Sequence, residues 1–185
     1  MAHIVIMGAG IGGMAMAYEM RAKAGKADVV TVVSNTPKFH FVPSNPWVAV
    51  NWRQRDEVEL EIEPLLKKRK IEFIATGVKR VHPDDNVLEL DDGRRIDYDF
   101  LIIATGPKLA FDEIEGLGPK GHTQSVCHID HAMHAQGEWG RFVEDPGPIV
   151  VGAVQGASCF GPAYEFAMTM ETDLRRRKIR DRIAE

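Results

Sequence analysis

A run of glycines directly after the first apolar segment limits this chain more than any other feature. Residues 3–7 read His-Ile-Val-Ile-Met, as a buried strand does, and Gly8, Gly10, Gly12 and Gly13 follow at once. Gly8 allows a tight turn, Gly10 lets the backbone approach a pyrophosphate, and Gly13 lets the next helix pack closely. The first amides of that helix then face the phosphates. The pattern predicts a dinucleotide site; the alternative is a glycine-rich turn in another α/β domain.

Length, charge and cysteine content narrow the class of protein. The chain has 185 residues, enough for one domain or one and a half, and a net charge of −4. We therefore expect no nucleic-acid partner. No apolar run is long enough to span a bilayer, and no basic segment precedes an apolar core at the N-terminus, so we expect no signal peptide. Two cysteines are too few for a disulfide framework, so a functional role for them would be chemical.

Helix and strand patterns alternate through the first half of the chain. Apolar residues at helical spacing predict a helix over 11–24 with Gly25 as its cap, and the β-branched run 29–33 predicts a parallel strand beside the first. The fold class is therefore α/β, a Rossmann-like domain with a small antiparallel β-meander. The other elements expected here are a helix over 62–69, a strand over 72–74, a meander over 78–97 with a turn at Asp92-Gly93, and a buried strand over 98–106.

The second half repeats the strand–glycine–helix pattern. Residues 107–147 connect to it and contain a helix near 130–143. A strand is then expected over 149–151, followed by Gly152 and Gly156 and a helix to about residue 178. This pattern predicts the start of a second Rossmann-like domain.

The segment 35–56 has no clear period. It combines three prolines with Phe39, Phe41, Trp47 and Trp52, which is typical either of a lid over a ligand or of an ordinary hydrophobic cluster. The choice between these two interpretations stays open at this point.

The residue that follows the second strand bears on the choice of dinucleotide. NAD-binding Rossmann units place an acidic residue about 20 positions after the glycines, where it holds the ribose hydroxyls. Ser34 stands there instead, with no acid beside it. A serine can bond a ribose less strongly, so Ser34 weakens the NAD hypothesis without selecting FAD.

The order of the motifs resembles that of the FAD-dependent pyridine nucleotide–disulfide oxidoreductase superfamily. Ala104-Thr105-Gly106 resembles its second flavin motif, and Thr76-Gly77-Val78 stands where members of the superfamily contact the adenine. The resemblance implies an FAD cofactor. In the second glycine-rich unit, Val154 replaces a glycine that NADH-binding members keep, so we expect no NAD(P)H site there.

Within that superfamily the chain is similar to sulfide:quinone oxidoreductases over essentially all of its length. The segments that carry the resemblance are 41–48, 104–109, 156–165 and the residues around Cys127. The resemblance implies oxidation of sulfide at the flavin, sulfane sulfur collected on cysteines, and transfer of two electrons to a membrane quinone. It implies FAD contacts at Gly8, Gly10, Gly12, Gly13, Ser34, Pro43, Val78, Ala104, Thr105 and Gly106, and catalytic roles for Cys127, Cys159, His131 and Glu165.

These residue types suit that chemistry. Cys159 stands at the start of a helix pattern with Pro162 in an early position, and a helix N-terminus stabilises the nucleophilic thiolate. The resemblance places Cys127 near the flavin and gives His131 and Glu165 roles in proton movement. The structural alternatives are cysteines that act as small core hydrophobes and a solvated histidine face at 128, 131 and 134, and no metal site is predicted.

Sulfide:quinone oxidoreductases are much longer than 185 residues, so the resemblance covers their N-terminal portion. It implies an incomplete FAD-binding domain at 1–106, a connecting segment at 107–147 and the first strand–helix unit of a second domain at 148–185. It also implies peripheral contact with the cytoplasmic membrane of a prokaryote, a quinone site outside this chain, and either a monomer or a homo-oligomer. The alternatives are an NADH:quinone oxidoreductase and a non-catalytic dinucleotide-binding module.

Overall fold

A computed structural model describes residues 1–157 and 159–183 and divides the chain into two compact units. The first unit comprises Met1–His40 and Glu59–Leu109, and the second comprises Phe41–Val58 and Ala110–Glu185. Each unit is built from two separate stretches, because the chain leaves the first unit after His40 and re-enters it at Glu59.

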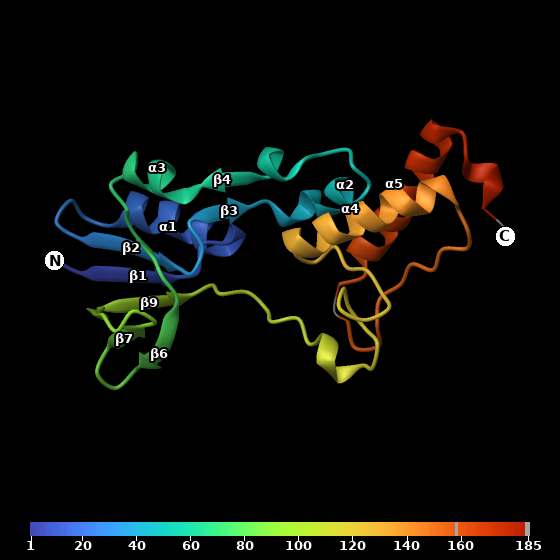
Figure 1. The fold of residues 1–185 in the computed structure, drawn as a ribbon. Coiled ribbons are helices and arrows are strands. Elements are labelled where there is room, and N and C mark those ends of the chain that lie inside the picture. The colour runs from blue at the N-terminus through green and yellow to red at the C-terminus, as the bar shows by residue number, and fades with distance from the viewer. Residues whose placement is uncertain (158, 184–185) are drawn as a thin grey trace. The chain divides into compact units, whose positions relative to one another are not determined.

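The first unit is built on a four-stranded parallel sheet. Its strands are ordered β5-β2-β1-β9, so β1 has a neighbour on each side (Figure 1). β-Branched residues dominate the two central strands and suit a sheet covered on both faces. The strands are β1 (His3–Met7), β2 (Val29–Ser34), β5 (Glu72–Ala75) and β9 (Phe100–Ile103).

Alternation along the strands gives the sheet two apolar faces. Ile6 packs with α1 (Ile11–Lys23) and α3 (Ile62–Lys67) on one face. Val5, its neighbour, packs with Leu88 of the meander on the other face. The expected Rossmann-like architecture and the meander are both present.

The meander and a short hairpin complete the first unit. The meander runs β6 (Val78–His82), β7 (Val87–Leu90) and β8 (Arg95–Asp97), all antiparallel. β3 (Lys38–His40) pairs antiparallel with β4 (Glu59–Glu61), and His40 lies opposite Glu59.

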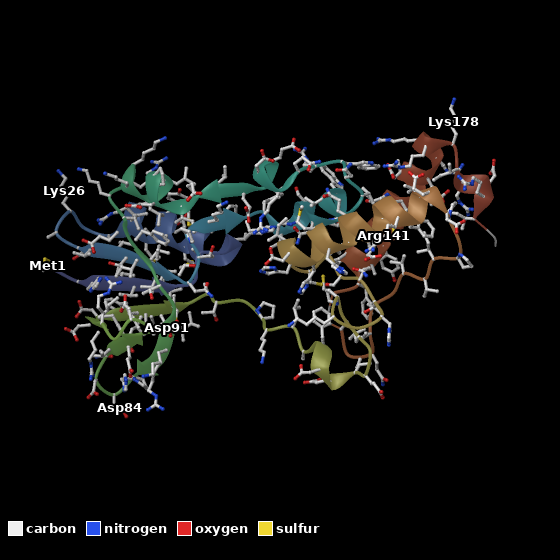
Figure 2. The ribbon with its side chains drawn as sticks, viewed as in Figure 1. Met1, Lys26, Asp84, Asp91, Arg141 and Lys178 are labelled. Carbon is white, nitrogen blue, oxygen red and sulfur yellow. The ribbon has the colours of Figure 1, made fainter. Side chains whose placement is uncertain are left out.

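The second unit is helical in the part that the structure describes. It contains α2 (Asn45–Ala49), α4 (Ile129–Glu144) and α5 (Gly161–Arg177), with single 3₁₀ turns at Val42–Ser44, Arg55–Glu57, Phe111–Glu113 and Arg180–Arg182. α5 ends at Arg177 and is capped by Lys178, which is labelled in Figure 2 and has a left-handed backbone conformation.

Two apolar clusters hold the second unit together. Val48 and Val58 pack on Ile129 and Ala132 of α4. Val50 packs with Trp139 and with residues of α5 in the other cluster. The segment 41–58 therefore supplies core residues to a unit that is otherwise formed by residues after 109.

Two local predictions from the sequence are wrong. No strand forms at 149–151: Val150 is 97% exposed, and in the described residues no neighbouring strand is hydrogen-bonded to this segment. An apolar run becomes a strand only where a partner strand exists. The cap of α1 is Ala24 in place of Gly25. The assignment of 148–185 to a second domain stays a prediction.

The aromatic residues of the irregular segment 35–56 divide into a packed group and an exposed group. Phe39 packs against the core of the first unit and Trp52 against that of the second, as in an ordinary hydrophobic cluster. Phe41 and Trp47 remain exposed. None of the helices in the described residues has the length and hydropathy needed to cross a bilayer.

Candidate functional site

The glycine turn after β1 is held between two other strands. The Gly8 amide donates to the Val33 carbonyl at 2.8 Å, and the φ angle of Gly8 is +104°. A Cβ atom on Gly8 would clash with the backbone carbonyl of Ala104, just beyond β9. Gly8 is therefore required by both its backbone angle and its neighbour.

The other glycines of the turn divide into a packed position and open positions. A Cβ on Gly13 would clash with the carbonyl of Gly8, so the helix begins too close to the turn for any side chain there. A Cβ on Gly10 or Gly12 would meet nothing within 4 Å. The bare backbone at Gly10 and Gly12 leaves room for a ligand, and the first turn of α1 contains no acidic residue that would repel phosphates.

The strand order places this turn where a parallel sheet binds ligands. The chain proceeds from β1 to β2 and β5 on one side, and β9 then joins on the other side of β1. The carboxyl ends of β1 and β9 therefore meet at a switch point in the strand order, which is where open parallel sheets generally bind ligands. Ala104 lies at that edge, with its amide donating to the Met7 carbonyl at 2.8 Å, and Thr105 and the left-handed Gly106 follow it.

Ser34 and Val78 contact the rest of the first unit in different ways. Ser34 ends β2, is 7% exposed, and its Oγ accepts from the Thr36 amide at 3.4 Å. Val78 begins β6 and packs partly into the core beneath the meander. Pro43 lies in the 3₁₀ turn Val42–Ser44 of the second unit. All other residues expected to contact FAD lie in the first unit.

Cys127 is an exposed free thiol directly before α4. Its amide donates to Ser125 Oγ at 3.2 Å. The next residue, His128, caps the helix, because its Nδ1 accepts from the Asp130 amide at 3.3 Å. The backbone on both sides of the thiol therefore has defined partners.

His131 lies in the first turn of α4 and is partly buried. Its ring packs edge-on against Phe111 at 5.4 Å between centroids and lies 5.6 Å from the His128 ring. Desolvation, together with the charges of His128 and His134, holds the pKa of His131 below its ordinary range, although Asp130 opposes this. Nδ1 is buried and has no hydrogen-bond partner among the described residues. His131 is therefore a neutral imidazole near pH 7.

Cys159 and Glu165 lie at the start of α5. Cys159 is an exposed free thiol one residue before Phe160, the N-cap, and the first turn of the helix contains no acidic side chain. Glu165 is exposed in the second turn. The four residues expected to be catalytic all belong to the second unit. Within residues 1–157 and 159–183, no hydrogen bond or ion pair joins their side chains to one another.

His134, the last histidine of this group, bonds a side chain outside α4. His134 Nδ1 lies 2.7 Å from Gln124 Oε1. In the part of the chain that the structure describes, no group of three or more His, Cys, Asp or Glu residues is arranged to hold a metal ion.

Comparison with known proteins gives the family. The model of the pyridine nucleotide-disulphide oxidoreductase family matches residues 2–167, which is most of the chain. The chain belongs to the pyridine nucleotide-disulphide oxidoreductases. In the structure, the glycine turn, the meander and the Ala-Thr-Gly strand end follow one another in the order from which the sequence predicted this family.

One relative is similar to this chain in both sequence and structure. The sulfide-quinone reductase of Aquifex aeolicus is 39% identical over 98% of this chain and 41% of its own length. The crystal structure of that organism's sulfide:quinone oxidoreductase matches 99% of this chain with a TM-score of 0.93. The type II NADH:quinone oxidoreductase of Staphylococcus aureus is 23% identical over 77% of this chain. The chain spans about two fifths of the length of the first of these proteins.

Sequence patterns alone did not identify two buried polar residues of this chain, Asn45 and Asp173. Asn45 is fully buried and its Nδ2 donates to the Val126 carbonyl at 2.8 Å. Asp173 is 4% exposed and accepts from the indole nitrogens of Trp52 and Trp139, both at 2.8 Å. Both residues contact partners distant in sequence, so no local pattern identifies them.

Proposed function

We propose that this chain holds FAD in its first unit and carries two of the redox cysteines of a sulfide:quinone oxidoreductase in its second. The observation that carries the proposal is that both cysteines are exposed free thiols directly before helices of one unit, where His131 is also found. The similarity to the sulfide-quinone reductase of Aquifex aeolicus supports it.

The first unit fits FAD on its own geometry. The open backbone at Gly10 and Gly12 gives a pyrophosphate room at the N-terminus of α1. Ser34 ends β2, at the position where such units bond a ribose, and Ala104-Thr105-Gly106 offers a strand end with only small side chains. When bound, FAD would supply two-electron transfer between sulfide and the acceptor.

The second unit supplies groups for the sulfur and the protons. The hydrosulfide ion loses one proton and two electrons as its sulfur reaches the sulfane level, and a quinone takes up two electrons and two protons to become the quinol. The net reaction consumes one proton. We assign the collection of sulfane sulfur to Cys127 and Cys159, because both are free thiols that are exposed next to a helix start and are therefore accessible to a small sulfur substrate.

His131 and Glu165 are proposed to move the protons. A neutral imidazole with an unpaired Nδ1 can accept a proton without first breaking a hydrogen bond. The Glu165 side chain is exposed to water. Quinone binding and peripheral membrane contact belong to the same proposal, and we place both outside this chain.

Reduction by NADH is the competing hypothesis. Val154, 42% exposed in the second glycine-rich segment, carries a side chain where a pyrophosphate would need bare backbone. The similarity to the type II NADH:quinone oxidoreductase of Staphylococcus aureus is also lower in identity and coverage. We therefore favour sulfide as the electron donor.

The deciding experiment is the visible absorption spectrum of the purified chain, recorded with added FAD before and after anaerobic sulfide. We expect an oxidised flavin spectrum that sulfide bleaches and NADH leaves unchanged. Bleaching by NADH alone would replace the proposal with the competing one. A flavin that binds but that neither donor reduces would refute the assignment of sulfur chemistry to this chain.

A further inference from the structure

We propose that Asn45 is a positioning residue that holds the backbone before Cys127 and so fixes the place of its thiol. The inference rests on the proposed function only for the chemical task of Cys127. The restraint itself follows from one hydrogen bond made by a fully buried side chain, from Asn45 Nδ2 to the Val126 carbonyl at 2.8 Å.

The hydrogen bond made by the Asn45 side chain does not cap or support the helix that contains it. Asn45 begins α2, and the N-cap residue Ser44 makes no side-chain capping bond. The amide of Asn45 instead donates to a carbonyl 81 positions further along the chain, within the same unit. A side chain that merely filled this fully buried position would be apolar, because an amide must be paired to be buried without a large penalty.

The bond acts at the residue next to the thiol. Val126 is held by Asn45 through its carbonyl, and Cys127 is held by Ser125 through its amide. His128 then caps α4. Cys127 is therefore an exposed side chain on a backbone whose hydrogen bonds are made on both sides.

The same segment is also joined to α4 further from the thiol. Gln136 Nε2 donates to the Val48 carbonyl at 3.0 Å, and Arg55 Nη1 lies 2.8 Å from Asp130 Oδ1. These contacts join α2 and the turn after it to α4 itself. Of the contacts that the structure describes for these side chains, it is the Asn45 bond that reaches the residue before Cys127, so its loss should act most strongly on Cys127.

The test is backbone ¹⁵N relaxation on the full chain. In the unchanged protein we expect order parameters of about 0.85 at Val126 and Cys127, the value of rigid backbone, and values below about 0.6 would overturn the proposal. Asn45→Asp keeps the side-chain shape but removes the donor. We expect it to lower the order parameter at Cys127 to about 0.6 or less near pH 7.

Acidification and a matched variant separate positioning from general loosening. Burial raises the pKa of the introduced carboxyl group, and its protonated form can again donate to the Val126 carbonyl. We therefore expect the order parameter at Cys127 to recover in mildly acidic solution. Gln136→Glu makes the same chemical change at the Val48 carbonyl and should leave Cys127 rigid.

Each remaining outcome is also decisive. An unchanged Cys127 in Asn45→Asp, or an equal loss of order in Gln136→Glu, would overturn the proposal. If Asn45→Asp does not fold, Asn45→Ala and the order parameters of the unchanged chain decide it. Sulfide takes no part in the measurement, so a chain that never reacts with sulfide refutes the proposed function and leaves this inference standing.

Discussion

Trp139 donates its indole N–H to Asp173 Oδ2 at 2.8 Å, which joins α4 to α5 through a buried carboxylate. Trp52 donates to the other oxygen at 2.8 Å, and the Arg177 guanidinium bonds Oδ2 as well. Three donors thus satisfy one charge that would be costly to bury alone. Asp173 fixes the helix that begins just after Cys159.

We expect Asp173→Asn to destabilise the chain. An amide accepts at only one atom, so an indole or the guanidinium loses its partner, and the free energy of unfolding should fall by about 2–3 kcal/mol. Urea unfolding followed by tryptophan fluorescence measures the change. Glu171→Gln is the control on the same helix. Glu171 forms ion pairs with Arg175 and Arg180 near the surface, so its replacement should lower the free energy of unfolding by under about 1 kcal/mol. Equal losses would show that burial of Asp173 is not decisive.

Gly10→Ala and Gly13→Ala should separate ligand binding from folding. A Cβ at Gly10 enters open space, so the melting temperature without FAD should stay the same while FAD affinity falls at least about tenfold, as a methyl group meets the pyrophosphate. A Cβ at Gly13 meets the Gly8 carbonyl, and we expect a loss of about 1–3 kcal/mol in stability with or without ligand. Calorimetry and FAD titration measure both. Unchanged FAD affinity in Gly10→Ala would remove Gly10 from the site.

His131 should make the chain less stable in acid. Its pKa is held below the ordinary value by desolvation, so the unfolded chain binds a proton at higher pH than the folded chain does. The contribution to stability is complete above about pH 6.5 and is lost as the pH falls through the lower pKa of the folded state, with a slope of at most about 1.4 kcal/mol per pH unit. His131→Gln should reduce the slope of the unfolding free energy against pH as the pH falls below about 6.5, the ordinary pKa of histidine. Identical slopes would contradict the burial of His131.

Cys159→Ala should stop the bleaching of bound flavin by sulfide. The variant keeps the glycine turn intact, so the oxidised flavin spectrum should remain and only the reaction should be lost. Stopped-flow absorbance under anaerobic sulfide measures it. Thr172→Ala, an exposed change further along α5, is the control and should react normally. Near-normal bleaching in Cys159→Ala would transfer the sulfur chemistry to Cys127 alone.

Local patterns were sufficient for most of the first unit. The strands at 3–7 and 29–33, the glycine turn and the Asp92-Gly93 turn depend on residues close in sequence, and the structure contains all of them. The family follows from the same motifs. The strand expected at 149–151 is wrong because strand formation depends on a partner elsewhere in the chain.

Long-range polar contacts could not be predicted. The arginines at 175–177 look like a solvated helix end, yet Arg176 lies 4.2 Å from the centre of the Trp52 ring and Arg177 bonds the buried Asp173. Gly77 is similar: a Cβ there would clash with the carboxylate of Asp91, which follows β7 (Figure 2). In each case the partner is identified only by the fold.

The excursion of the chain between His40 and Glu59 offers a way to isolate the first unit. These two residues lie opposite each other in the β3–β4 pair, so an Asn-Gly type I′ turn could join them directly in place of 41–58. A shortened polypeptide ending at Leu109 would then omit Val48, Val50 and Val58, whose burial depends on later residues. Simple truncation after Leu109 would instead leave those valines in water, and that product should aggregate where the rejoined hairpin stays soluble.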